Sequence, residues 1–172
     1  MTQTSEKQFS RSYGLDEIAL VPSYRTLDPD LVDISTTIAG VKLDIPIFAS
    51  AMDSVVSPET AIEIGKQGAV GVLNLEGVQT RYEQPETVLE KISTVDKQSY
   101  VPLMQEIYQD NEVKENLVRQ RIQKIKESGV PTIVSSTPQS ASWLGPIAAD
   151  AGADVFIIQS TVVSPNFQAK DG

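Results

Sequence analysis

The chain has 172 residues, 40% of them hydrophobic, and carries a formal net charge of −9 at neutral pH. This composition is typical of a globular protein, and the excess of negative charge argues against binding to a nucleic-acid backbone. The sequence contains neither cysteine nor histidine, which excludes disulfides, thiolate or imidazole metal sites, a cysteine nucleophile and a histidine proton shuttle for this chain.

Residues 1–43 are expected to form an amino-terminal arm and docking segment. The first residues are polar and lack the apolar stretch of a secretory signal, and no later stretch is apolar for long enough to cross a bilayer. We therefore expect a cytoplasmic protein without membrane association. Ile18–Val21, followed by Pro22, is a short apolar run that indicates docking. The acidic turn at 28–33 lacks the glycine and terminal glutamate of a calcium loop, so no metal site is expected.

Four short apolar runs in residues 44–172 predict strands. They lack the alternation of a half-buried strand, a pattern typical of parallel strands that are buried on both faces. The runs are 44–52, 69–74, 131–136 and 153–161.

Helical periodicity occurs once after the first strand, twice after the second and once after the third. Caps and apolar spacing predict helices over 57–68, 84–92 and 110–129, the last with Asp110 as its cap. Residues 93–109 have poor periodicity, so the second unit is expected to be broken or elaborated. A fourth helix is predicted from Thr137, and Gly145–Pro146 should break or restart it.

Strands that alternate with helices demand right-handed crossovers and a parallel sheet. The predicted fold is therefore α/β, with about four β/α units that correspond to the first half of a (β/α)₈ TIM barrel, a fold of roughly 250 residues. A doubly wound sheet is the alternative, although no glycine-rich phosphate loop follows the first strand.

Several motifs are shared with one enzyme family. Ile18–Pro22, the strand-end motif Ala49–Val55 (Ala-Ser-Ala-Met-Asp-Ser-Val), the pair Gly68 and Gly71, and Ile158–Thr161 lie along most of the chain. Together they resemble the IMP dehydrogenase and GMP reductase family. The amino-acid sequences of segments 13–23 and 72–77 look closest to those of a bacterial subfamily without the regulatory CBS domains.

The resemblance implies two groups of site residues at the carboxyl ends of strands. Ser50 and Met52 would line the pocket of a purine mononucleotide, IMP or GMP. The nicotinamide cofactor, NADP or NAD, would contact Gln159, Ser160, Thr161 and Asn74.

Two positions depart from the family pattern. Gln159 stands where dehydrogenases of the family carry an aspartate, and a neutral amide repels a ribose 2′-phosphate less, which favours NADP. The segment Asn74–Glu76 stands where IMP dehydrogenases often carry histidines near the adenine. We expect Glu76 to be a solvated loop residue.

By resemblance, a cysteine after the sixth strand attacks purine C2, and hydride passes between C2 and the nicotinamide. This chain has no cysteine, so it would be truncated before that loop, contain no catalytic residue and be inactive alone. The family also implies a homo-oligomer, a tetramer. IMP oxidation and GMP reduction stay open. Two alternatives remain: a noncatalytic half-barrel that acts through assembly, and another phosphate-binding or flavin-dependent barrel.

Overall fold

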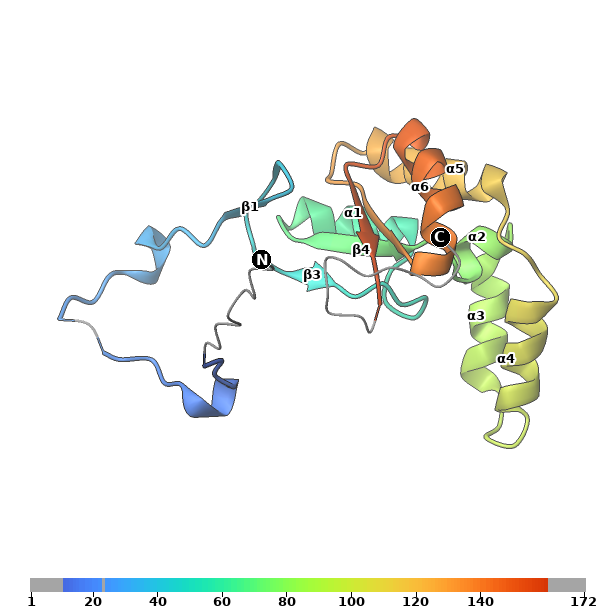
Figure 1. The fold of residues 1–172 in the computed structure, drawn as a ribbon, viewed down its shortest axis with the longest axis horizontal. Helices are drawn as coiled ribbons and strands as arrows, with labels where there is room; N and C mark the ends of the chain where they lie inside the picture. The colour runs from blue at the N-terminus through green and yellow to red at the C-terminus, as the bar shows by residue number, and fades with distance from the viewer. Residues whose placement is uncertain (1–10, 23, 161–172) are drawn as a thin grey trace, which may run out of the picture. The chain divides into compact units, whose positions relative to one another are not determined.

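The computed structural model describes residues 11–22 and 24–160, which fall into two compact units (Figure 1). The first unit ends at Asp33 and contains two short 3₁₀ helices, η1 (Leu15–Glu17) and η2 (Pro29–Leu31). None of its described residues is buried, and Leu20 and Val21 of the apolar run are fully exposed. The docking role of that run stays a prediction.

The second unit begins at Ile34 and is built on a four-stranded parallel sheet. The strands pair in chain order, with Ala49 opposite Gly71, Asn74 opposite Ser135, and Ser136 opposite Ile158. This arrangement confirms the predicted α/β class. The four strands are β3 (Phe48–Ala49), β4 (Val70–Asn74), β5 (Ile133–Ser136) and β6 (Val155–Ile158).

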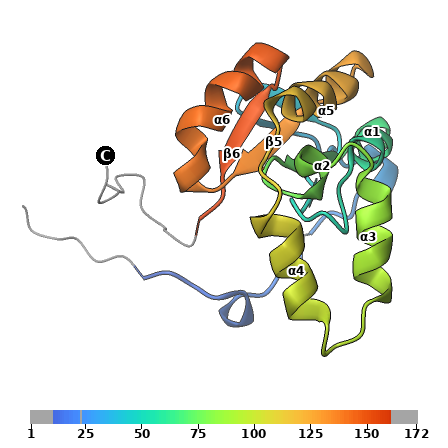
Figure 2. The same ribbon diagram turned by 90° about the vertical axis from the view of Figure 1, so that its right-hand side faces the viewer.

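Helices connect the strands and pack mainly on one face of the sheet (Figures 1 and 2). In both views α3 and α4 lie side by side as a hairpin that projects away from the strands. The helices are α1 (Pro58–Lys66), α2 (Val78–Arg81), α3 (Pro85–Thr94), α4 (Tyr100–Gln109), α5 (Glu115–Glu127) and α6 (Pro138–Ala151).

Both faces of the sheet are apolar, as the strand pattern predicts. On one face Leu73 and Val134 join a buried cluster that contains side chains of α1, α5 and α6. On the opposite face Val72 and Ile133 pack with Leu43. Burial on two faces explains why these strands carry continuous apolar runs.

Leu43 belongs to a β-hairpin that the sequence pattern did not predict. Its strands are β1 (Thr36–Ile38) and β2 (Val41–Leu43), and they pair antiparallel. The two-residue turn places Ala39 at φ 49° and Gly40 at φ 82°. Positive φ at both central residues is the geometry that two-residue hairpin turns favour.

The structure corrects three details of the predicted elements. The first strand is much shorter than 44–52. Before it, Pro46 has no amide hydrogen for a ladder bond, and after Ala49 the chain turns, with the amide of Met52 bonded to the carbonyl of Ser50. The expected elaboration of the second unit is confirmed, because residues 93–109 contain the whole of an additional helix, α4. Asp110, however, ends that helix rather than capping the next, which starts at Glu115.

The third correction concerns α6, which runs unbroken through Gly145 and Pro146. Proline removes the amide that would bond the carbonyl of Ser142, but Ser142 is exposed, so water can reach that carbonyl. Meanwhile Leu144 and Ala148 are fully buried against the core. Burial of this face holds the helix together across the proline.

Within the part of the chain that the structure describes, no helix combines the length and apolar character needed to cross a membrane.

Candidate functional site

Because the sheet is parallel, the carboxyl ends of its strands lie together at one end of the sheet, which we call the strand-end edge. Ser50 and Met52 follow β3, Asn74 ends β4, and Gln159 and Ser160 follow β6. The structure therefore brings these predicted site residues to the same edge of the sheet, where barrel enzymes bind their ligands. Thr161 lies outside the described residues.

The turn after β3 holds Met52 at this edge. The amide of Met52 donates to the carbonyl of Ser50 at 2.8 Å, and the carbonyl of Met52 accepts the amides of Val55 and Val56, both at 2.9 Å. Ser50 is exposed and Met52 is 49% exposed. A backbone fixed in this way presents an accessible thioether side chain, which adapts readily to a planar ligand.

Gln159 is positioned by the sheet itself. Its amide donates to the carbonyl of Ser136 at 2.8 Å, one residue beyond the end of β6, and its side chain is exposed. Asn74 is half-buried, and its Oδ1 accepts the amide of Glu76 at 3.0 Å. The Asn74 side chain thus stabilises the turn after β4, a role that the motif did not predict.

The expectation that Glu76 is solvated is wrong. Its carboxylate is half-buried and accepts the amide of Thr137 at 2.5 Å, the hydroxyl of Thr137 at 3.1 Å and the hydroxyl of Ser140 at 2.6 Å. These donors belong to the first turn of α6, where a helix leaves amides without partners and carries partial positive charge. Glu76 therefore caps α6.

Asp53, which directly follows Met52, makes a similar link that the sequence did not reveal. Its Oδ2 accepts the amide of Val78 at 2.9 Å and the hydroxyl of Tyr108 at 2.6 Å. Among the described residues, Oδ1 is buried without a hydrogen-bond partner. It lies against Gly77, where an added Cβ would stand 1.9 Å from it.

The contact changes the acidity of the tyrosine. Burial raises the pKa of the Tyr108 phenol, and the hydrogen bond to Asp53 together with the charge of that carboxylate raises this pKa further. The phenol therefore stays neutral and acts as a donor over the physiological pH range.

Arg81 connects the turn after β4 to the end of α4. Its guanidinium donates to the carbonyl of Glu76 at 2.9 Å and to that of Tyr108 at 3.1 Å, and it also bonds the carbonyl of Asn111. The same group lies 5.4 Å from the centre of the Tyr108 ring. The α3–α4 hairpin is thus fastened to the edge that carries the predicted site.

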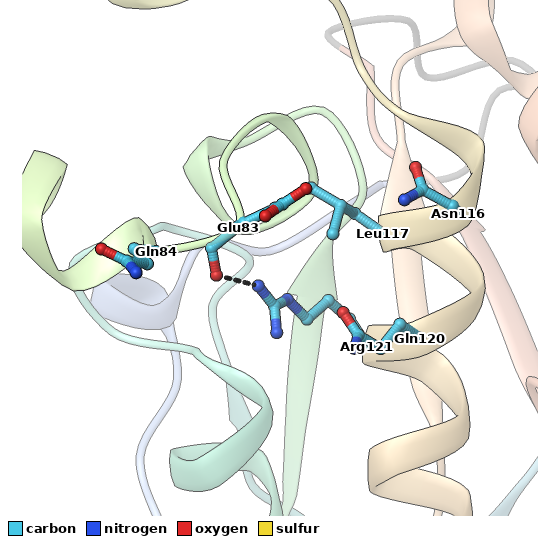
Figure 3. Close-up of a pocket in the computed structure, with 6 residues that line it drawn as sticks. All are labelled: Glu83, Gln84, Asn116, Leu117, Gln120 and Arg121. Carbon is cyan, nitrogen blue, oxygen red and sulfur yellow. Dashed lines mark hydrogen bonds between the residues drawn. The ribbon is translucent and has the colours of Figure 1, made fainter.

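Two clefts in the described part of the chain contain none of the predicted site residues. One of about 540 Å³ lies between α5 and the α2–α3 connection (Figure 3). There Arg121 donates to the carbonyls of Gln79, Tyr82 and Glu83, so this arginine secures the connection.

The second cleft, of about 370 Å³, is lined by Asp53, Glu59 and Glu86 among other residues. Three acidic side chains make it a poor place for a phosphate group. The predicted site residues lie instead at the exposed strand-end edge.

Comparison with known proteins gives the family context. The model of the IMP dehydrogenase / GMP reductase domain matches residues 12–165. An uncharacterised oxidoreductase of Mycobacterium tuberculosis is 35% identical over 167 residues, which are 94% of this chain and 44% of that protein. An inosine-5′-monophosphate dehydrogenase of Methanocaldococcus jannaschii is 34% identical over 93 residues, 49% of this chain and 19% of that enzyme.

A solved structure supports the same relationship. The crystal structure of an IMP dehydrogenase/GMP reductase-like protein from Corynebacterium glutamicum superimposes with a TM-score of 0.81 at 33% identity. The match covers 92% of this chain and 43% of that one. The chain thus spans less than half the length of these relatives.

Proposed function

Since the chain belongs to the IMP dehydrogenase / GMP reductase family, we propose that it forms one wall of the active site in an NAD(P)-dependent purine nucleotide oxidoreductase. The observation that carries the proposal is the common edge that Ser50, Met52 and Gln159 share at the carboxyl ends of parallel strands. In barrel enzymes this edge is where chemistry takes place.

The proposed substrate is a purine mononucleotide, IMP or GMP, with hydride transfer at purine C2. Ser50 would hydrogen-bond the nucleotide, and the half-exposed Met52 would contact its ring. The fixed turn between them supports this assignment, because a ligand binds more tightly to groups that need no ordering.

The proposed cofactor is NADP or NAD, whose nicotinamide exchanges the hydride with the substrate. The exposed amide of Gln159 has the donor and acceptor that a ribose requires, and its lack of charge favours NADP. Ser160, Thr161 and Asn74 complete the proposed contacts. One acceptor of Asn74 is already used within its own turn.

The chain itself has no thiol or imidazole. The nucleophile that bonds purine C2 must therefore come from residues outside these 172, and this chain alone is inactive in our proposal. The proposal includes a homo-oligomeric enzyme, a tetramer as the family implies, and a cytoplasmic location where purine nucleotides and nicotinamide cofactors are available.

A second candidate is a noncatalytic half-barrel that acts through assembly. It is favoured by one observation: β3 and β6 are the outer strands of the sheet, so within the described residues each has one edge without a strand partner. Unpaired edges are sites of association.

Substitutions of Ser50 and Met52 at the strand-end edge separate the oxidoreductase from the noncatalytic half-barrel. In the complete protein, meaning the longest natural product that contains this chain, Ser50→Ala and Met52→Ala should each weaken binding of IMP or GMP about tenfold, as loss of a single good contact does. Isothermal titration calorimetry measures this. Exposed Ser93→Ala on α3 is the control. A wild-type protein that binds neither IMP nor GMP would favour the noncatalytic candidate, whereas unchanged affinity in both variants would remove Ser50 and Met52 from the proposed contacts.

A further inference from the structure

Two carboxylates link neighbouring loops at the strand-end edge in the same manner. Asp53 follows β3, and its Oδ2 accepts the amide of Val78, the first residue of α2, which follows β4. Glu76 follows β4, and its Oε2 accepts the amide of Thr137, the N-cap of α6, which follows β5. Each acid reaches from the loop after one strand to the helix after the next.

Each link is reinforced by hydroxyl donors. Tyr108 donates to the same oxygen of Asp53 that Val78 uses, and Ser140 donates to Oε1 of Glu76. Hydrogen bonds to a charged acceptor are about twice as strong as neutral ones. The relative positions of three successive loops therefore depend on two side chains.

Both carboxylates adjoin residues of the proposed site. Asp53 is covalently next to Met52, and the amide of Glu76 donates to Oδ1 of Asn74. A shift of the Asp53 link displaces the proposed nucleotide loop, whereas a shift of the Glu76 link displaces the turn that carries Asn74.

We propose that Asp53 and Glu76 are positioning residues: Asp53 sets the affinity for the purine nucleotide and Glu76 the affinity for the nicotinamide cofactor, each through the loop that it fixes. This inference rests on the proposed function. Neither carboxylate is proposed to touch a ligand: donors of the protein occupy Oδ2 of Asp53 and both oxygens of Glu76, and Oδ1 of Asp53 is buried against Gly77.

The opposite end of the sheet, where the strands begin, provides a matched control. Asp154 precedes β6, and its Oδ2 accepts the amide of Thr132 at 2.9 Å while Lys126 pairs with its other oxygen. It is the same kind of link, a carboxylate that bonds a backbone amide across two chain segments. However, it lies at the amino ends of the strands, away from the proposed ligands.

The experiment compares Asp53→Ala, Glu76→Ala and Asp154→Ala in the complete protein, with steady-state kinetics, thermal unfolding and hydrogen exchange of the backbone amides. Asp53→Ala should raise the nucleotide KM and Glu76→Ala the cofactor KM, each about tenfold, while kcat stays within about threefold. Asp154→Ala should lower the Tm and leave both KM values unchanged.

Conservative variants supply the rescue. Asp53→Asn and Glu76→Gln keep an acceptor oxygen and should restore most of the lost affinity. Tyr108→Phe keeps Asp53 itself and should give a smaller rise in the nucleotide KM. It serves as the test if Asp53→Ala fails to fold.

Two results would overturn the inference: KM values within about twofold of wild type in Asp53→Ala and Glu76→Ala despite a lower Tm, or an equal KM increase in Asp154→Ala. A wild-type protein without turnover would contradict the proposed function instead. Hydrogen exchange then decides the positioning role, which requires faster exchange at residues 50–56 in Asp53→Ala and at 74–77 in Glu76→Ala, but not in Asp154→Ala. Unchanged exchange rates would refute it.

Discussion

The phenolic oxygen of Tyr108 lies 2.6 Å from Oδ2 of Asp53, across 55 residues of sequence. This bond joins α4, in the projecting hairpin, to the loop after the first parallel strand. It therefore connects a peripheral element to the edge where we place the nucleotide.

This contact predicts a pH dependence of stability. Burial and Asp53 raise the pKa of Tyr108 in the folded state. The neutral phenol is thus stabilised by folding, so its contribution is complete below the unfolded-state pKa of about 10 and is lost as the pH rises beyond it. Tyr108→Phe should lower the free energy of unfolding by about 1–2 kcal/mol at neutral pH, with a smaller difference above pH ~10.

Denaturant unfolding across the alkaline range checks this, with exposed Tyr24→Phe as the control. A difference between wild type and Tyr108→Phe that stays constant with pH would contradict the role of the phenol.

The packing of Asp53 against Gly77 predicts a steric effect. Gly77 has φ −87°, which any residue can adopt, so alanine there meets no backbone strain. Its Cβ would instead overlap Oδ1 of Asp53. Gly77→Ala should destabilise the protein by about 1–3 kcal/mol, as overpacking does. Gly145→Ala, in open space within α6, should stabilise it by about 0.5–1 kcal/mol. Equal effects of the two substitutions would refute this view of Gly77.

Much of the parallel sheet could be predicted because burial on both faces leaves a continuous apolar run. The hairpin 36–43 escaped prediction because Ala39 adopts positive φ, where asparagine, aspartate or glycine is the usual signal. Pro146 gave a misleading signal for α6, since a local propensity cannot register the burial of Leu144 and Ala148 that outweighs it.

The candidate site was also predictable only in part from the sequence. Ser50, Met52 and Gln159 could be placed at one edge, because parallel pairing fixes where strand ends meet. The roles of Asp53 and Glu76 depend on donors 25 to 64 residues away, and no spacing rule indicates such partners. Motif resemblance locates residues, but only the folded chain reveals what holds them in place.

The neutral side chain at Gln159 predicts cofactor preference. In the complete protein, Gln159→Asp places a carboxylate where we propose the cofactor ribose, and this charge repels a 2′-phosphate. The KM for NADPH should rise by a larger factor than the KM for NADH. Gln159→Asn, which keeps the amide, is the matched control. Equal effects on the two cofactors would remove Gln159 from this role.

The sides of the outer strands, β3 and β6, that are unpaired within the described residues predict that residues 1–172 expressed alone self-associate. Within the described residues, β3 and β6 each have an edge without a strand partner, beside exposed Ile47 and Ile158. Two copies would pair these edges. Light scattering should show mass that grows with concentration, and Ile158→Lys should reduce the association by placing a charge at the edge. A concentration-independent monomer near 18.7 kDa would contradict this expectation.

The most direct test of the account is a turnover assay that follows the absorbance of reduced nicotinamide with IMP and an oxidised cofactor, and with GMP and a reduced one. The complete protein should turn over one of these pairs, whereas residues 1–172 alone, verified by mass, should turn over neither, because they contain no thiol to bond purine C2. Turnover by the short chain, or a complete protein that is inactive with both pairs, would contradict the account.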